Sequence, residues 1–186
     1  TSLQNLAAFN VTAIGDGKNY FTDLGVSSAD NGVNWTTAST YYWPGYELAF
    51  FAYAPQAPAG TVSIDNASKK ITGFSPAQAV ADQKDLVISY NTGTKGPGVA
   101  MNFKHALSQI EVKAKCSNDK IKIEIMGVKL VNAAAKAEFA FPETETKSSY
   151  VLQQSQWSNW SEKDDPTKAY MIKGGAPVIL TADAQR

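Results

Sequence analysis

The sequence has few of the residues that carry metal, redox or ionic chemistry. It contains one cysteine and one histidine in 186 residues, and only 18% of its residues are charged. A single cysteine closes no disulfide within the chain and supplies no zinc site built from several thiolates. The 17 basic and 17 acidic side chains balance, so the chain lacks the electrostatic signature of a protein that binds nucleic acid or anionic membranes. We therefore expect no cofactor, no metal site and no nucleic-acid partner.

Long apolar runs are also missing. The longest apolar block, Leu48–Ala54, has the length of a strand, whereas a membrane-spanning helix needs about 18 apolar residues or more. We therefore expect no transmembrane segment. The chain begins with Thr1 and shows no signal peptide, which indicates that its N-terminus has been processed. The absence of a signal is therefore no evidence for a cytoplasmic protein.

What the sequence does have is a period of two. Apolar and polar residues alternate in stretches at 9–13, 110–115, 121–125 and 139–141. Such alternation is typical of a strand with one buried face. Leu48–Tyr53 and Leu86–Ile88 are apolar on both faces, which predicts central strands. Val99–Phe103 is a shorter strand candidate, and a change of phase after Gly127 predicts a β-bulge or a bend.

Turns separate these strands at spacings of about ten residues, which predicts a β-sandwich rather than alternating strands and helices. Helical sequence is limited to one or two turns in 75–85, with Ser75 as the N-cap. The polar excursion at 142–168 is long enough to be functional or to contain short strands.

We expect an all-β protein with two lobes. The glycine-rich loop at 93–98 is the predicted boundary, which divides the chain into residues 1–95 and 96–186. The neighbourhood of Cys116 is the second choice for this boundary.

Catalytic chemistry has two candidate settings, and both have plainer explanations. His105 and Cys116 would form a nucleophile pair only if the fold brought them together. A histidine held by a carboxylate or backbone partner, and an inert thiol, are the simpler interpretation. Carboxylates occur close together at 82–85, 143–145 and 164–165, where solvated loops are a simpler explanation than a glycoside-hydrolase cleft. We therefore expect no enzymatic activity.

Aromatic side chains crowd two stretches, one at Tyr41–Tyr46 and one at Trp157–Trp160. Exposed Tyr and Trp rings can stack on sugars, because an apolar face with a polar tip suits a pyranose. A carbohydrate-binding surface module with Tyr41, Trp157 and Trp160 as its platform is therefore an alternative function. The competing explanation is that these rings fill the core or an interface between lobes.

Four short motifs, in this order, resemble the fimbrillin family of Bacteroidetes. The first is Tyr42-Trp43-Pro44, and the second is the apolar strand Leu48–Pro55. The third is 83–87 (QKDLV), and the fourth is 103–110 (FKHALSQI). Their order and spacing over about residues 9–140 are similar to those of the family, and Trp157 resembles a position where the family often carries a tryptophan.

The resemblance implies a cell-surface fimbrial protein, anchored at the outer membrane, with two β-sandwich lobes of transthyretin-like topology. Precursors in this family resemble lipoproteins that are clipped after a basic residue, which opens a groove in the first lobe. A strand from a neighbouring subunit then fills the groove by β-augmentation. Here Thr1–Ala13 would be the newly exposed segment, with Phe9 and Val11 directed inward.

The resemblance also implies what the remaining positions do. It offers no catalytic residues, and six motif positions are expected to be structural: Tyr42, Trp43, Pro44, Phe103, His105 and Leu107. Relatives continue past the strand at 177–180, so the second lobe is expected to be incomplete and the donor strand to lie in the missing part. We predict a structural subunit or adhesion component of a fimbria or pilus. Its partners would be other fimbrial subunits, joined by strand addition, and host or bacterial surface ligands.

Overall fold

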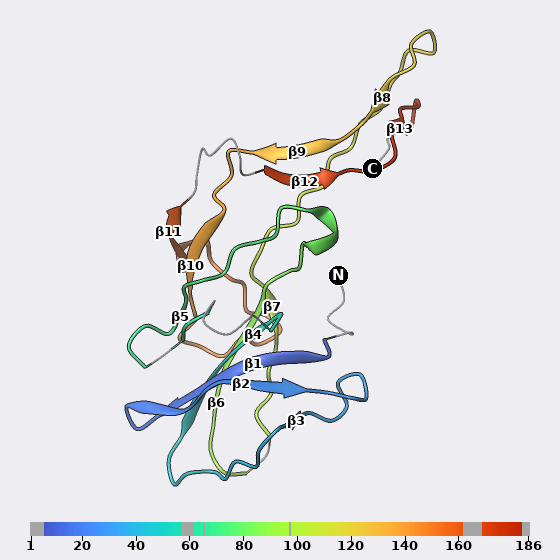
Figure 1. The fold of residues 1–186 in the computed structure, drawn as a ribbon. Coiled ribbons are helices and arrows are strands. Elements are labelled where there is room, and N and C mark those ends of the chain that lie inside the picture. The colour runs from blue at the N-terminus through green and yellow to red at the C-terminus, as the bar shows by residue number, and fades with distance from the viewer. Residues whose placement is uncertain (1–5, 57–61, 65, 97, 162–168, 184–186) are drawn as a thin grey trace. The chain divides into compact units, whose positions relative to one another are not determined.

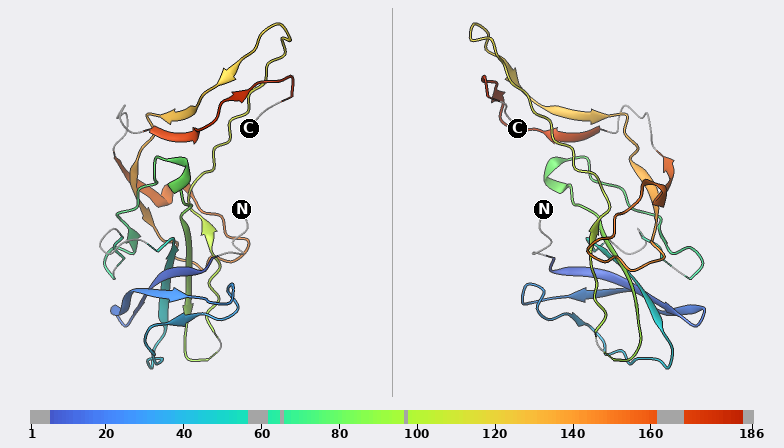
Figure 2. Two further views of the ribbon diagram at one scale, coloured as in Figure 1. Left: turned by 45° about the vertical axis from the view of Figure 1, so that its right-hand side comes forward. Right: turned by 180° about the vertical axis from the view of Figure 1, so that it is seen from behind.

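The structure, a computed structural model, describes residues 6–56, 62–64, 66–96, 98–161 and 169–183 (Figures 1 and 2). These residues form antiparallel sheets, and their helical content is limited to short 3-10 turns at Val80–Asp82 (η2) and Gln154–Gln156 (η3). The protein is thus all-β, as its alternating sequence predicts. The helical turns predicted at 75–85 reduce to η2, because Ser75 does not cap a helix and its hydroxyl instead donates to the carbonyl of Ala135 at 2.6 Å.

The largest sheet has six strands in the order β3-β2-β1-β4-β6-β7. These strands are β1 (Ala8–Gly15), β2 (Lys18–Ser27), β3 (Thr36–Thr37), β4 (Leu48–Ala54), β6 (Val87–Gly93) and β7 (Lys104–His105). β4 pairs with β1 on one side and with β6 on the other, which makes it central. Its two apolar faces predict this position, because a strand covered on both sides buries every side chain.

Three smaller sheets contain the remaining strands. The first has the order β11-β10-β5, from β5 (Lys70–Ile71), β10 (Lys136–Ala140) and β11 (Trp157–Ser161). The other two pair β9 (Val128–Val131) with β12 (Ala169–Lys173), and β8 (Glu124–Ile125) with β13 (Val178–Ile179). The strands β8 and β9 are interrupted at Met126–Gly127, where the change of phase predicts a bend.

Two hydrophobic clusters lie on opposite faces of the six-stranded sheet. The first fills the space between this sheet and the β5–β10 sheet, and its central members are Phe51, Ile71, Leu86, Ile88 and Phe139. The second covers the other face, where Phe9, Val11, Ala52 and Ala54 are joined by Met101 and Phe103 from a segment outside the strands. One face of the sheet is therefore covered by a second sheet, and the other by loops.

The chain divides into two compact units, each built from three segments. The first contains Thr1–Phe74, Asp85–Leu107 and Ala137–Trp160, and the second contains Ser75–Lys84, Ser108–Lys136 and Ser161–Arg186. These units are groups of residues in contact with one another, whereas the predicted lobes are parts of the chain that fold independently. Contacts alone do not test independent folding. The boundary at residue 95, with its alternative near Cys116, therefore stays a prediction, and so does the transthyretin-like topology.

Two predicted strands are not formed. Residues 99–103 lie outside any strand, and of 110–115 only Ala114 makes an isolated bridge. Met101 and Phe103 still pack on the second cluster. Ile110 and Val112 line a hollow with Ala114 but are 51% and 41% exposed, so the buried face predicted for 110–115 is not formed. Alternation sets the direction of side chains, but a strand also needs a neighbouring edge to hydrogen-bond with, which the local sequence does not reveal.

Candidate functional site

The predicted groove residues Phe9 and Val11 lie on β1, which is paired on both sides. β1 pairs with β2 from Ala8 to Gly15 and with β4 from Asn10 to Ile14, so Val11 has a strand on both sides. Phe9 lies just beyond the β4 ladder, and its carbonyl accepts a hydrogen bond from the side chain of Gln56 at 3.1 Å. Their side chains are buried, and the ring of Phe9 lies 5.0 Å from that of Trp35 and 5.1 Å from that of Phe103. Residues 1–5 of the predicted exposed segment lie outside the described residues. A groove at Phe9 and Val11 in the processed protein stays a prediction.

The outer strands of the six-stranded sheet are very short. β3 pairs only with Val26 and Ser27 at the end of β2, and β7 pairs only with Val87 and Ile88 at the start of β6. Natural sheets use short edge strands to limit unwanted pairing with other chains. The rest of β6, from Ser89 to Gly93, pairs with β4 on one side and has no strand on its other side among the described residues.

A side chain from a loop occupies this part of the β6 edge. Thr146, which is fully buried, donates its backbone N–H to the carbonyl of Tyr90 at 3.0 Å, and its hydroxyl accepts the N–H of Tyr90 at 3.1 Å. The same hydroxyl lies 2.8 Å from the carbonyl oxygen of Asn102, to which it donates. One threonine thus makes the bonds that a neighbouring strand would make. We call residues 143–148 the edge segment.

The sequence does not identify Thr146 as a core residue. It is flanked by Glu145 and Lys147, which pair with each other at 3.5 Å, and such a sequence is typical of a solvated loop. Lys104 helps to hold the edge segment, because its ammonium donates to the carbonyl of Ser148 at 2.7 Å. Burial, and then the nearby carboxylates of Glu47 and Glu143, raise the pKa of Tyr90, so its phenol stays neutral beside this loop.

A buried polar network joins β1, β2 and β4. The hydroxyl of Tyr53 donates to Asp23 Oδ1 at 2.7 Å, and the amide of Asn10 donates to the same oxygen at 2.8 Å. Burial, and then the hydrogen bond to Asp23, raise the pKa of Tyr53, so the phenol remains a donor at neutral pH. Asp23 has a φ of 51° at an irregularity of the β1–β2 ladder. The network therefore holds a bulge, and the sequence contains no signal for it.

The six motif residues lie in the first unit, and three of them pack against its clusters. Trp43 lies 5.8 Å from the ring of Phe50, Phe103 joins the second cluster, and Leu107 packs on the first. Pro44 is partly exposed. Two motif residues are exposed. The side chain of Tyr42 is 79% exposed, and its backbone carbonyl accepts a hydrogen bond from the hydroxyl of Tyr20. His105 is exposed as well and contacts Asp85.

The candidate platform aromatics differ in exposure. Tyr41 and Trp160 are 43% and 48% exposed, whereas Trp157 packs on the buried ring of Phe139 at 4.9 Å. The rings of Trp157 and Trp160 lie 5.8 Å apart at an interplanar angle of 32°. Trp160 therefore offers a ring face to solvent, while Trp157 belongs to the edge of the core.

The titratable candidates have local partners. His105 Nδ1 contacts the carboxylate of Asp85, and Cys116 Sγ lies 3.4 Å from the carbonyl of Asn118. The two residues belong to different units.

The carboxylates of 164–165 lie outside the described residues. In the described part of the chain no group of three or more metal-ligating side chains gathers, and no helix there is long and apolar enough to cross a membrane.

Asp30 illustrates how the loops satisfy their own carboxylates. Its side chain accepts hydrogen bonds from the backbone and amide of Asn34 and from the hydroxyl of Ser28. These bonds, the Asn34 backbone first, hold the pKa of Asp30 at about 2. The turn is thereby closed on itself, and the carboxylate is committed to its own loop.

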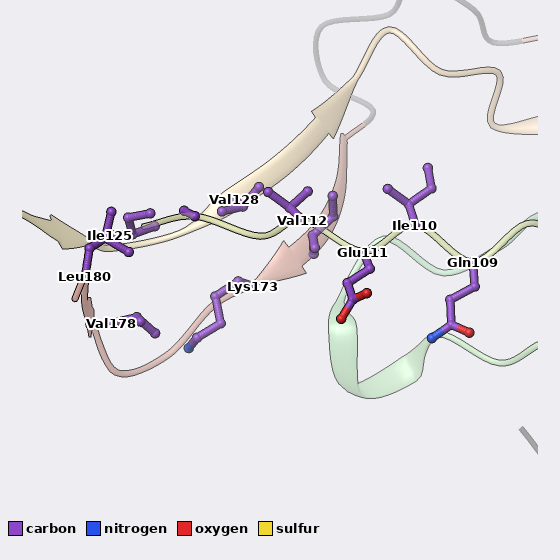
Figure 3. A pocket seen from close by; sticks show the side chains of 11 residues that line it. Gln109, Ile110, Glu111, Val112, Ile125, Val128, Lys173, Val178 and Leu180 are labelled. Atoms are coloured by element: carbon purple, nitrogen blue, oxygen red, sulfur yellow. The ribbon is translucent and has the colours of Figure 1, made fainter. Parts of the chain in front are cut away.

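The second unit contains an apolar hollow of about 240 Å³ (Figure 3). Its walls are mainly aliphatic, from Ile110, Val112, Ile125, Val128, Ile172, Val178 and Leu180. Figure 3 shows Gln109 and Glu111 directed away from Ile110 and Val112, as alternation along an extended segment requires. Lys173 donates to the carbonyls of Gly174 and Ala176 at 2.6 and 3.0 Å, so its charge is bound at the rim. The hollow suits apolar side chains.

Comparison with known proteins gives one result. A family model described as fimbrillin-like matches residues 3–180, nearly the whole chain. No curated protein and no solved structure matches significantly.

Proposed function

The chain belongs to the fimbrillin-like family, and on that premise we propose that it is a structural subunit or adhesion component of a bacterial surface fimbria, assembled by β-strand donation. The family is one of structural proteins, and membership suggests a fimbrial subunit role at the cell surface and contacts with other subunits. Export with removal of a signal and anchoring at the outer membrane complete this proposal.

The observation that carries the proposal is the incomplete edge of β6. Its backbone is satisfied at Tyr90 by a single threonine of a loop rather than by a strand. A strand makes bonds along its whole length, whereas Thr146 supplies bonds at one position only. The N–H of Thr92, the next one along this edge, is accepted by the side chain of Asn91 at 2.8 Å. An incoming strand would thus replace local side-chain bonds with a continuous backbone ladder, which is the bonding that gives β-augmentation its affinity.

The second hydrophobic cluster gives such a strand an apolar surface. β4 presents the small residues Ala52 and Ala54 to this face, and Phe9 and Phe103 lie over them. Asn91 links β6 to the segment that carries Phe103, through a 2.8 Å hydrogen bond to the carbonyl of Ala100. A donor strand that also replaces the segment carrying Phe103 would uncover the ring of Phe9. Apolar side chains of the donor would then contact that ring.

The proposal predicts slow self-association of the processed subunit. At high concentration the purified protein should convert over hours to days into oligomers that survive SDS without heating, because strand exchange must first open native contacts. Electrophoresis of heated and unheated samples, with size-exclusion chromatography, measures this conversion. The unclipped precursor is the control and should stay monomeric. A processed protein that stays strictly monomeric would contradict assembly by strand donation.

Carbohydrate binding is a second candidate function, favoured by the exposed ring of Trp160. Its neighbour in sequence, Asn159, bonds to Glu138 through its side chain; this bond first, and then Lys70, lower the pKa of the Glu138 carboxyl. A Trp160→Ala variant should lose binding on a glycan array while its melting temperature stays unchanged. Trp157 is unsuited to this test because it packs on Phe139. If the native protein binds no glycan, the candidate is wrong.

A further inference from the structure

The outer edge of β8 is a strand edge without a strand beside it. β8 pairs with β13 on one side, Ile125 with Val178 and Glu124 with Ile179, and no strand of the described residues pairs with its other side. Figures 1 and 2 show β8 and β9 along the margin of the second unit. Such an edge offers its backbone groups to another strand.

The bonds to β13 determine which backbone groups face outward. The N–H of Leu180 donates to the carbonyl of Ile123 at 3.0 Å, so the backbone groups of Ile123 point toward β13. Backbone groups alternate in direction along an antiparallel strand. The N–H and C=O groups of Lys122 and Glu124 therefore point away from β13 and form the outer edge.

The side chains of this edge alternate as well. Lys122 and Glu124 form an ion pair of 2.6 Å on one face, with side chains 66% and 43% exposed. Ile121 and Ile123 belong to the opposite face and are 54% and 40% exposed. Exposed isoleucines along a free strand edge lose contact with water if another strand with the same pattern lies beside them.

We propose that residues 121–125 pair antiparallel with the same residues of a second copy of this chain, about a two-fold axis at Ile123. In this register Lys122 lies opposite Glu124 of the second copy, and Glu124 lies opposite its Lys122. These are the residues whose backbone groups point outward, so they form the hydrogen-bonded pairs of the new ladder. Ile123 lies opposite Ile123 of the second copy, and Ile121 lies opposite Ile125 of the second copy.

Charge selects this register over its neighbours. An axis at Lys122 places two lysines opposite each other, and an axis at Glu124 places two glutamates opposite each other, which is unfavourable. The β9 half of the margin lacks this complementarity. Its one charged residue, Lys129, is flanked by the apolar residues Val128, Leu130 and Val131 and has no acidic neighbour to face. The edge of β8 is thus complementary to itself in one arrangement.

The contact is isologous, so it closes after two copies. It is also weak, because an edge of five residues buries less than the roughly 1,200–2,000 Å² of a standard interface. It does not depend on the proposed function. Within a fimbria it would join two filaments side by side, since many weak contacts along an array act together.

Charge reversal tests the register directly. Lys122→Glu and Glu124→Lys should each weaken dimerisation of the 186-residue chain by about tenfold or more, because each places like charges opposite each other twice. An equimolar mixture of the two variants should dimerise again, since every glutamate then faces a lysine. Sedimentation velocity over a concentration series measures the dissociation constants.

Lys129→Glu is the matched control, because it changes the net charge equally on the neighbouring strand β9 and should leave dimerisation unchanged. The inference is overturned by a native chain that remains monomeric at millimolar concentration, by a Lys122→Glu variant that associates like the native chain, or by a mixture that fails to recover. SDS-resistant oligomers should form equally in all variants, which separates this contact from strand donation.

Discussion

Replacing Phe139 with alanine is expected to lower the free energy of unfolding of the first unit by about 3–5 kcal/mol, the range for truncating a buried aromatic ring. Phe139 is fully buried in the first hydrophobic cluster, and its ring contacts those of Phe141 at 5.9 Å and Trp157 at 4.9 Å. It also pairs with Ile71 across the β10–β5 ladder. Truncation therefore leaves a cavity between the two sheets that rigid neighbouring strands cannot close.

Urea titration followed by circular dichroism measures this loss. Tyr42→Ala is the matched control, since it removes an aromatic ring that is 79% exposed while the carbonyl that Tyr20 binds is retained. Surface substitutions of this kind change stability by about 0.5 kcal/mol or less. Equal effects of the two substitutions would show that the first cluster does not hold the sheets together.

Replacing Thr146 with valine is expected to cost about 2 kcal/mol or more and to release the edge segment. Valine has the shape of threonine without its hydroxyl, so the N–H of Tyr90 loses its acceptor and the carbonyl of Asn102 loses its donor. Each buried polar group left without a partner costs about 1–3 kcal/mol. The lost hydrogen bonds are those that hold the edge segment on β6, and the proposed assembly requires this segment to leave β6.

Hydrogen exchange at the amide of Tyr90 and urea titration measure the effect. Both should change in Thr146→Val, and the variant should form SDS-resistant oligomers faster than the native protein. Thr146→Ser is the control, because it keeps the hydroxyl and should leave exchange and assembly close to native. If the valine and serine variants exchange equally fast, the hydroxyl does not protect this edge.

The sequence predicted the strands whose pattern is strong and whose partners are long. β4 carries apolar residues on both faces and is central, and Phe9, Val11 and Phe139 are buried where the alternation places them. Such a pattern is informative because a shift of one residue would turn every apolar side chain of a strand to the wrong face. The family resemblance came from four short motifs and their spacing, and the strand Leu48–Ala54 is the mainly buried one among them.

Other features depend on contacts between residues far apart in the chain. Nothing around Thr146 distinguishes it from a solvated loop residue, and its partners Tyr90 and Asn102 lie 56 and 44 positions away. The network of Tyr53, Asp23 and Asn10 spans separations of up to 43 residues. Ser75 was expected to cap a helix, but it binds Ala135 instead, 60 residues away.

The sequence by itself determined that this is an all-β protein, that the apolar side chains of β1, β4 and β10 turn inward, and which family it resembles. These properties follow from the two-residue period of extended chains and from short motifs, both of which are local. The tertiary structure alone decided which extended stretches become strands, which edges remain free, and which loop residue takes a strand's place. Backbone hydrogen bonds between strands join segments that are distant in the chain, and each segment carries the same donors and acceptors whatever its side chains, so sequence contains little record of the pairing.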